Sequence, residues 1–466
     1  MTKIGILKNH FFPQGWHKCD WTERILDTIN IKGMEPHLID GPEQVSKDVP
    51  FYLTRMNHDA GEKNTARLSQ KLDELALQFE KRRSMLIPNS YNYRLYENKE
   101  KIANLFGRTG VKCPKSYLFN SVDEAMATQI EFPVVIKHPF SCASNFMLQA
   151  YNSDEFHSNI KNFFNRFSEC LVQEKISFTR EARVIFVGDE AIHGYFRFKK
   201  NEETMSASTA FGSYLSFDIN LQRMSEHISD FRKRTNIEIG AVDMAWANDD
   251  LNSEPYYFEV SPIFGINPVG PSDVAYKKFK GTPEYHKRSI EIRNHYYSKV
   301  IDYNLEKASK PIIYCDIDFT INDAGPRIRK WTENGRINPS YGRYEEVMLD
   351  PCVEESRDIL NNAKDKYRII FMTARAKYPQ PYLTTRDWLV KNNFHYDQII
   401  ITRNFEEKLD IMKREPNLSL FIDDLTRGHH ESVVEVKKQC IKDLIYNNIP
   451  FVRYDNNWDK IKEMIK

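Results

Sequence analysis

Two aspartates at the end of a short apolar run are the residues of this chain best suited to chemistry. The run 312–315 predicts a buried strand, and Asp316 and Asp318 follow it, two residues apart. Side chains at this spacing leave an extended chain on the same side, so both carboxylates can converge on one Mg²⁺ ion and one phosphoryl group. Buried acids are costly unless they are paired or used. This strand end therefore predicts a catalytic site.

Further polar residues follow downstream in a regular order. They are Thr373 after one apolar run, Lys408 at the opening of a predicted helix, and Asp423 and Asp424 after a second apolar run. The carboxyl ends of parallel strands meet at one edge of a sheet, so these side chains are expected near the first two aspartates. One local motif alone could reflect buried acids with local hydrogen-bond partners. The ordered set favours a site.

This set resembles the haloacid dehalogenase (HAD) superfamily of phosphatases and phosphotransferases, over roughly the last third of the chain. The resemblance implies that Asp316 is a nucleophile that forms an aspartyl-phosphate and that Asp318 is the general acid and base. It also implies that Thr373 and Lys408 hold the phosphoryl oxygens. The Mg²⁺ ligands would be Asp316, Asp318, Asp423 and Asp424. Phe319 stands where the superfamily usually has glycine.

The segment between the first two motifs predicts a small lid. Roughly fifty residues separate Thr320 from Thr373, too few for a large cap domain, so a lid over 322–344 is expected. Arg375 is a candidate ligand for phosphate or substrate. This region resembles both capsule-biosynthesis phosphatases and the phosphatase half of phage polynucleotide kinases. The near-neutral charge favours a small metabolite or sugar phosphate, and a nucleotide 3′-phosphate stays open.

Composition bounds the rest of the chain. Its 466 residues predict two or three domains, and 66 basic against 65 acidic residues give no overall field for nucleic acid. No apolar run is long enough to span a membrane, which predicts a soluble cytoplasmic protein. Seven cysteines without a Cys-x-x-Cys pair fit reduced thiols and no zinc site. The strand, helix and strand expected at 3–7, 20–31 and 36–39 predict an α/β beginning.

A second series of motifs precedes the first. A helix over 99–109 ends at Gly110, and the strand 132–136 leads into Lys137. A strand and hinge follow at 171–176 and can offer backbone groups to an adenine edge. Later strands carry acids and guanidinium groups, namely Glu181, Arg183, Arg197, Asp243 and Glu259. The last two acids lie on strands about one hairpin apart, so they can face a shared metal.

These features resemble the ATP-grasp superfamily, especially its carboxylate-amine ligases of the glutathione synthetase and ribosomal-protein-modifying type, over about 99–268. The resemblance implies that Lys99 and Lys137 contact the ATP phosphates and that Glu174 and Ile176 line the adenine pocket. Glu181 would touch the ribose. Arg183 and Arg197 would bind phosphate or a substrate carboxylate. Asp243 and Glu259 would be ligands of Mg²⁺.

Two departures from that family are visible. The loop 138–145 has no glycine, although backbone N–H groups normally close over the phosphates there. The usual Glu-x-Asn metal pair ends in Ser261, and Asn267 downstream could take over as the amide ligand.

The expected architecture is therefore an α/β and α+β multidomain protein. It has a preceding α/β domain at 1–95, an ATP-grasp domain at 96–304, a linker at 305–311, and a Rossmann-like HAD domain with a small cap at 311–466. The main hypothesis is a bifunctional enzyme that uses ATP and Mg²⁺, with a carboxylate, an amine and a phosphoester as substrates. Two alternatives stay open, namely a kinase opposed by a phosphatase, and a nucleotide-binding or substrate-binding module that serves a phosphatase. Oligomeric state is not predicted.

Overall fold

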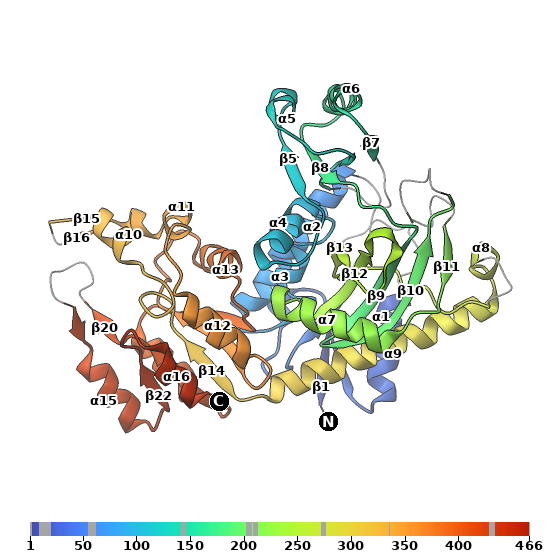
Figure 1. Cartoon of the computed structure of the whole chain (residues 1–466). Coiled ribbons are helices and arrows are strands. Elements are labelled where there is room, and N and C mark those ends of the chain that lie inside the picture. Colours follow the sequence, from blue (N-terminus) through green and yellow to red (C-terminus); the bar gives the residue numbers. More distant parts are fainter. Residues whose placement is uncertain are drawn as a thin grey trace. The chain divides into compact units, whose positions relative to one another are not determined.

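Contacts along the chain divide it into two compact units, each of which is described by itself. The computed structural model describes residues 2–8, 20–54, 62–140, 146–201, 207, 213–271, 276–334, 336–427 and 434–465 (Figure 1). Unit 1 comprises 1–76 and 86–303, and unit 2 comprises 77–85 and 304–466.

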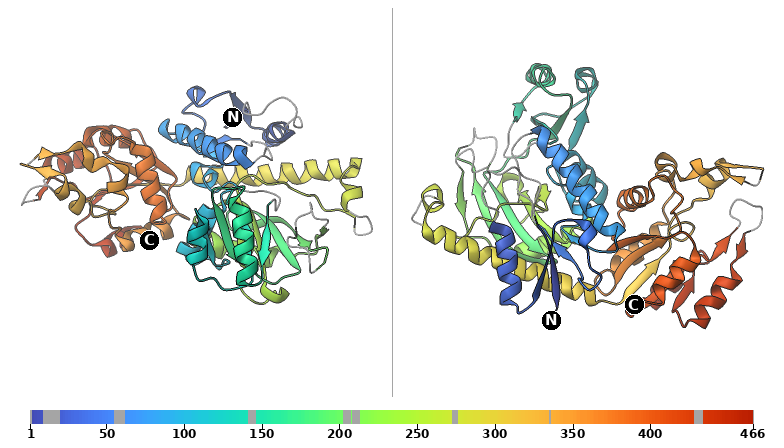
Figure 2. Two further views of the ribbon diagram at one scale, coloured as in Figure 1. Left: turned by 90° about the horizontal axis from the view of Figure 1, so that it is seen from above. Right: turned by 180° about the vertical axis from the view of Figure 1, so that it is seen from behind.

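The boundary near residue 303 falls inside one unbroken helix, α9 (Pro283–Ser309) (Figures 1 and 2). The linker expected at 305–311 is therefore helical as far as Ser309. Residues 305–308 are Leu, Glu, Lys and Ala, which are strong helix formers, so they continue the helix. The helix ends shortly before Pro311, which cannot donate a backbone hydrogen bond.

The N-terminal part of unit 1 is built on a small parallel sheet. Its strand order is β2-β1-β3-β4, and all its pairs are parallel. The strands are β1 (Lys3–Leu7), β2 (Glu35–Ile39), β3 (Tyr52–Leu53) and β4 (Leu86–Ile87), with η1 (Pro42–Gln44) and helices α1 (Asp20–Ile31), α2 (Glu62–Lys81) and α3 (Ser90–Tyr93) between or after them. The predicted α/β beginning is confirmed.

A four-stranded antiparallel sheet follows, in the order β5-β8-β6-β7. Its elements are α4 (Lys99–Thr109), β5 (Ser116–Phe119), α5 (Val122–Ala127), β6 (Val134–Lys137), β7 (Leu148–Ala150), α6 (Ser153–Phe164) and β8 (Cys170–Glu174). Figure 1 shows α5 and α6 side by side next to this sheet, and a buried apolar core joins them to it. The sheet therefore presents its strand ends, including Lys137, from a rigid support.

A five-stranded antiparallel sheet completes unit 1, in the order β11-β10-β9-β12-β13. Its elements are β9 (Arg180–Val187), β10 (Glu190–Phe198), β11 (Tyr214–Ser216), α7 (Leu221–Thr235), β12 (Ile239–Ala245), η3 (Ala247–Asp249), β13 (Tyr256–Ser261) and α8 (Tyr276–Phe279). Asp243 and Glu259 are direct partners across β12 and β13, as the hairpin spacing predicts.

Unit 2 contains a five-stranded parallel sheet in the order β18-β17-β14-β19-β22. Its strands are β14 (Ile312–Cys315), β17 (Arg368–Thr373), β18 (Gln398–Ile401), β19 (Leu418–Asp423) and β22 (Phe451–Arg453). The helices around it are α12 (Glu354–Ala363), α13 (Pro381–Lys391), α14 (Phe405–Met412), α15 (Lys438–Tyr446) and α16 (Trp458–Met464). Strand β14 comes first in the sequence among these five strands and lies in the centre of the sheet. The strand order therefore reverses direction at β14.

Alternate residues of these strands feed two separate cores. Ile313 and Cys315 pack with α12, α13 and α16, whereas Ile312 and Tyr314 pack with α14 and α15. Period-two alternation thus buries both faces of the sheet under helices, as parallel sheets require. The carboxyl ends of the strands, where Asp316 and Asp423 lie, form a polar edge of the sheet.

The segment expected to be a small lid contains regular structure. It holds α10 (Gly325–Lys330), β15 (Thr332–Glu333), β16 (Arg336–Ile337), η4 (Pro339–Gly342) and the start of α11 (Tyr344–Val347). Two short strands, β20 (Thr426–Arg427) and β21 (Glu435–Val436), form a separate pair near the end of β19. Among the described helices, none has an apolar stretch that could cross a membrane.

Candidate functional site

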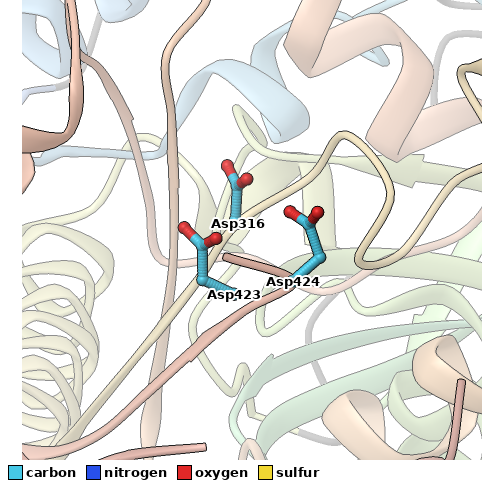
Figure 3. A group of neighbouring side chains, drawn as sticks. All are labelled: Asp316, Asp423 and Asp424. Atoms are coloured by element: carbon cyan, nitrogen blue, oxygen red, sulfur yellow. The ribbon is translucent and has the colours of Figure 1, made fainter. Parts of the chain in front are cut away.

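Three carboxylates meet at the polar edge of the unit 2 sheet. Asp316 follows β14, Asp423 ends β19, and Asp424 comes next, and each offers an oxygen within 4.8 Å of the others. All three residues are buried, and Figure 3 shows their carboxylates pointing to the same side. Among the described residues this is the one group of three or more possible metal-ligating side chains. Oxygen donors in this number suit a hard cation such as Mg²⁺.

Lys408 neutralises part of this charge. Its Nζ lies 2.9 Å from Oδ1 of Asp316 and 2.8 Å from Oδ2 of Asp423. Burial, together with the charges of Asp423 and Asp424, raises the pKa of Asp316 to about 7 against the opposing effect of Lys408. Burial would lower the pKa of Lys408, but the two carboxylates it contacts raise it well above its ordinary value. The lysine is thus a fixed cation beside the predicted nucleophile.

Asp318 points to different partners. Arg375 donates two hydrogen bonds to its carboxylate, of 2.8 and 2.7 Å, and Arg327 donates a third of 3.1 Å. Burial would raise the pKa of Asp318, but Arg375 and then Arg327 hold it well below its usual range. In this arrangement Asp318 is a base, and its predicted action as an acid requires the two guanidinium groups to move.

A buried network around Asp318 was missed by sequence reasoning. Arg327 forms a two-atom contact with Asp350, at 2.9 and 2.8 Å, and Asn322 donates to both Asp350 and Asp318. Burial raises the pKa of Asp350 to about 6. Arg327 lies in the segment expected to be a lid, yet it is 4% exposed and paired. No local pattern joins residues 327 and 350.

The remaining predicted residues of this edge are also in place. Thr373 ends β17 and is buried, and the Thr320 hydroxyl accepts a 3.1 Å hydrogen bond from the backbone N–H of Asp424. Phe319 adopts φ 65°, the left-handed conformation that favours glycine, and its N–H donates to Oδ1 of Asn322. The phenylalanine therefore keeps the turn that glycine usually makes.

In unit 1, Lys137 lies at the end of β6 and is buried. Its Nζ donates to Oε1 of Gln173 at 2.6 Å, and Gln173 in turn donates to the Ser116 hydroxyl. Burial, together with the neighbouring cation Lys99, lowers the pKa of Lys137 to about 7. Gln173 was not singled out from the sequence, because a polar residue inside a strand gives no signal of its own.

A charged cluster lies on β9, β10 and β12. Arg183 donates to both oxygens of Asp243 at 2.7 and 2.6 Å, and Arg197 lies 2.7 Å from Asp243 and 2.6 Å from Glu181. Burial raises the pKa of Glu181. Burial would do the same to Asp243, but Arg183 and Arg197 hold its pKa well below the usual range. Both oxygens of the predicted metal ligand Asp243 are thus engaged by guanidinium groups.

Glu97 was missed and belongs to the same electrostatic cluster. It precedes the N-cap Asn98 of α4, has φ 50°, and lies 3.6 Å from the Lys99 ammonium. Burial, together with the charge of Glu259, raises the pKa of Glu97 to about 7. The charge of Glu259 also acts to raise the pKa of Lys137, against the effect of burial. Lys137 of the four-stranded sheet and Lys99 of α4 therefore share one electrostatic cluster with acids of the five-stranded sheet.

Other predicted residues fall around this cluster. Ile176 is buried, and Glu174 is exposed and accepts from the Lys115 N–H. Asn267 donates its side-chain amide to the Tyr195 hydroxyl, and Ser261 donates to a nearby backbone carbonyl. The metal-binding part expected of Asn267 stays a prediction. Of the glycine-free loop, 141–145 lie outside the described residues.

Comparisons with known proteins agree with this part of unit 1. Residues 96–251 match the model of the RimK-like ATP-grasp domain. The coenzyme gamma-F420-2:alpha-L-glutamate ligase of Methanocaldococcus jannaschii is 27% identical over 175 residues, which are 34% of this chain and 59% of that protein. The chain thus spans about three fifths of that relative.

Two solved structures are also similar to this chain. A RimK domain ATP-grasp protein from Sphaerobacter thermophilus has a TM-score of 0.39 at 11% identity, covering 65% of this chain and 99% of that one. The D-alanine–D-alanine ligase of Bacillus anthracis complexed with ATP has a TM-score of 0.39 at 15% identity, covering 66% and 97%. Likenesses this distant say nothing of substrates.

Residues 96–251 are therefore a RimK-like ATP-grasp domain, and the cofactors of such domains are ATP and Mg²⁺. The chemistry of the cluster fits this pair. Lys99 and Lys137 supply cations for phosphates, and Glu259 is a carboxylate beside them. The matched residues end at 251, before the second site, so the role of that site is a matter for proposal.

Proposed function

We propose that this protein is a bifunctional enzyme, an ATP-dependent carboxylate-amine ligase joined to a Mg²⁺-dependent phosphatase. The observation that supports the ligase is the match of residues 96–251 together with the buried cluster that carries Lys137 and Asp243. The ligase assignment also draws on the glutamate ligase named above.

In the proposed ligase reaction, an oxygen of the substrate carboxylate attacks the γ-phosphorus of ATP and ADP leaves. An amine then attacks the acyl carbon, and phosphate leaves with one oxygen of the original carboxylate. Lys99 and Lys137 hold the transferring phosphoryl group, and Arg183 or Arg197 orients the substrate carboxylate after exchanging its contact with Asp243. Bound Mg²⁺ would supply charge neutralisation on the phosphates, with Glu259 and Asp243 as its protein ligands.

In the proposed phosphatase reaction, the Asp316 carboxylate attacks the phosphorus of a phosphoester, and the leaving oxygen takes a proton from Asp318. Water activated by Asp318 then hydrolyses the aspartyl-phosphate. Lys408 and Thr373 hold the phosphoryl oxygens. Asp316, Asp423 and Asp424 would hold Mg²⁺, which would stabilise the charge of the phosphoryl group. This half is proposed as a HAD-type domain because its acids, threonine and lysine meet at one sheet edge in the expected order.

The ligase is tested by following ADP release from ATP and Mg²⁺ with pools of carboxylic acids and amines, in an Asp316→Asn background that silences the phosphatase. Release that needs both an acid and an amine supports the ligase. A phosphorylated product would favour the kinase alternative, and ATP binding without turnover would favour a binding module that serves the phosphatase.

A further inference from the structure

A pocket of about 360 Å³ opens in unit 1 beside the charged cluster and is assigned no role by the reaction above. It is lined by His193 of β10, by Pro268 and Val269, and by Arg288, Glu291, Ile292 and His295 of α9. Its volume is in the range of small-molecule sites. The four helix residues stand at positions i, i+3, i+4 and i+7, so they present one face of α9 to the pocket.

The pocket starts close to the charged cluster. His193 lies two residues before Tyr195 on β10, which places them about 7 Å apart along one face of the strand. Tyr195 pairs with Arg183 across the sheet, and its hydroxyl accepts a hydrogen bond from Asn267. The carbonyl oxygen of the same Asn267 lies 2.6 Å from Nε2 of His193. The pocket is thus linked through His193 and Asn267 to Tyr195, the cross-strand neighbour of Arg183.

The pocket offers two hydrogen-bond acceptors, on His193 and Glu291, and one donor group, on Arg288. A carbonyl oxygen only accepts, so Nε2 of His193 carries the proton of that contact, and Nδ1 of the neutral ring is an acceptor. Glu291 is a second acceptor, and among the described residues it has no hydrogen-bond or ion-pair partner. Arg288 uses one N–H group on Glu284 and one on the Val269 carbonyl, out of five available.

We propose that this pocket binds the amine substrate of the ligase, and that this substrate is a small molecule carrying both an amino group and a carboxylate. The amino group faces Glu291 and Nδ1 of His193, the carboxylate faces the remaining N–H groups of Arg288, and the aliphatic part lies on Pro268, Val269 and Ile292. Glu291 and His193 are then positioning residues for the nucleophile. The inference rests on the proposed ligase function.

The test is a binding measurement on the full chain carrying Asp316→Asn, with each of the twenty standard L-amino acids as probe, by saturation-transfer NMR without ATP. At least one amino acid is expected to bind, and its N-acetyl and amide derivatives are each expected to bind at least tenfold more weakly. Glu291→Gln should weaken the amino acid at least tenfold and leave the N-acetyl derivative unchanged. Glu306→Gln, the same change at an exposed position of the same helix, is the matched control.

The outcomes separate the pocket from the ligase. Binding of none of the twenty, or equal binding to the Glu291→Gln and Glu306→Gln proteins, overturns the pocket assignment. Amino-acid-dependent ADP release with an unchanged KM in Glu291→Gln also overturns it, while the ligase stands. Binding that responds to Glu291→Gln without any ADP release supports the pocket and contradicts the ligase.

Discussion

Arg183 of β9 and Asp243 of β12 lie opposite each other in the sheet and share two hydrogen bonds, of 2.7 and 2.6 Å. Asp243 also contacts Arg197, so this one buried carboxylate pairs with two partly buried guanidinium groups. A predicted metal ligand is thereby held in an arginine network. Binding of Mg²⁺ and an anionic substrate at this site is expected to exchange these contacts, with the guanidinium groups turning to the substrate.

The first prediction concerns the stability of this network. Asp243→Ala should lower the free energy of unfolding by about 3 to 5 kcal/mol, because it removes the buried counter-charge of Arg183 and leaves Arg197 with Glu181 alone. Chemical denaturation of the full chain measures the change. Asp230→Ala is the control, since its pair with Arg234 is exposed on α7 and should contribute under about 1 kcal/mol. A loss of that small size for Asp243→Ala would show that the network is not a stabilising element.

The second prediction concerns protons taken up with ATP. Lys137 has its pKa lowered to about 7 by burial, so at pH 8 most of this amine is neutral without ligand. Phosphates close to the amine would raise its pKa, and binding would then take up a proton. Affinity for ATP should therefore fall as the pH rises above 7.

Calorimetry at pH 8 in buffers of different ionisation enthalpy measures this uptake. Glu97, with its pKa raised to about 7 by burial, responds in the same direction, so both Lys137→Met and Glu97→Gln should reduce the proton count. An uptake that is unchanged in Lys137→Met would place the phosphates away from this lysine.

The third prediction concerns the nucleophile of the second site. Asp316→Asn should abolish hydrolysis of an aryl phosphate in the presence of Mg²⁺, because the amide is no longer a nucleophile. Asp410→Asn is the control, an exposed aspartate on α14, the helix that carries Lys408. Circular dichroism should show both variants folded. Full activity in Asp316→Asn would exclude the proposed aspartyl-phosphate.

The fourth prediction concerns Arg375. Arg375→Lys should lower kcat for the aryl phosphate by about 10- to 100-fold, because an ammonium cannot make the two-atom contact that fixes Asp318. The pH profile of kcat is the informative readout. The substitution should weaken the charge that lowers the pKa of Asp318, so the part of the pH profile that reports the titration of Asp318 should move to higher pH. An unchanged profile and rate would mean that the contact is only a resting arrangement.

Local signals predicted much of the fold. Helix α4 has the expected bounds, because Asn98 caps its first turn and Gly110 ends it in the left-handed conformation. The pairing of Asp243 with Glu259 followed from the hairpin spacing. The expected linker is helical through 305–308 because these residues are strong helix formers, and the helix ends shortly before Pro311, as the proline predicts.

Contacts between distant positions could not be predicted. The contacts of Arg327 with Asp350 and of Lys137 with Gln173 depend on how buried elements pack, and no periodicity encodes them. The pairing of Asp318 with Arg375 is of the same kind. Sequence motifs located the charged residues, and packing decided which charges neutralise each other.

The central claim is that a carboxylate is activated by ATP, and an oxygen-18 measurement tests it most directly. The acid that supports ADP release is labelled with oxygen-18 in its carboxylate and turned over by the Asp316→Asn protein with its amine. The released phosphate is analysed by mass spectrometry. We predict one oxygen-18 atom in each phosphate, because the acyl-phosphate leaves with one carboxylate oxygen. Unlabelled phosphate, or a label retained in a phosphorylated product, would contradict the ligase.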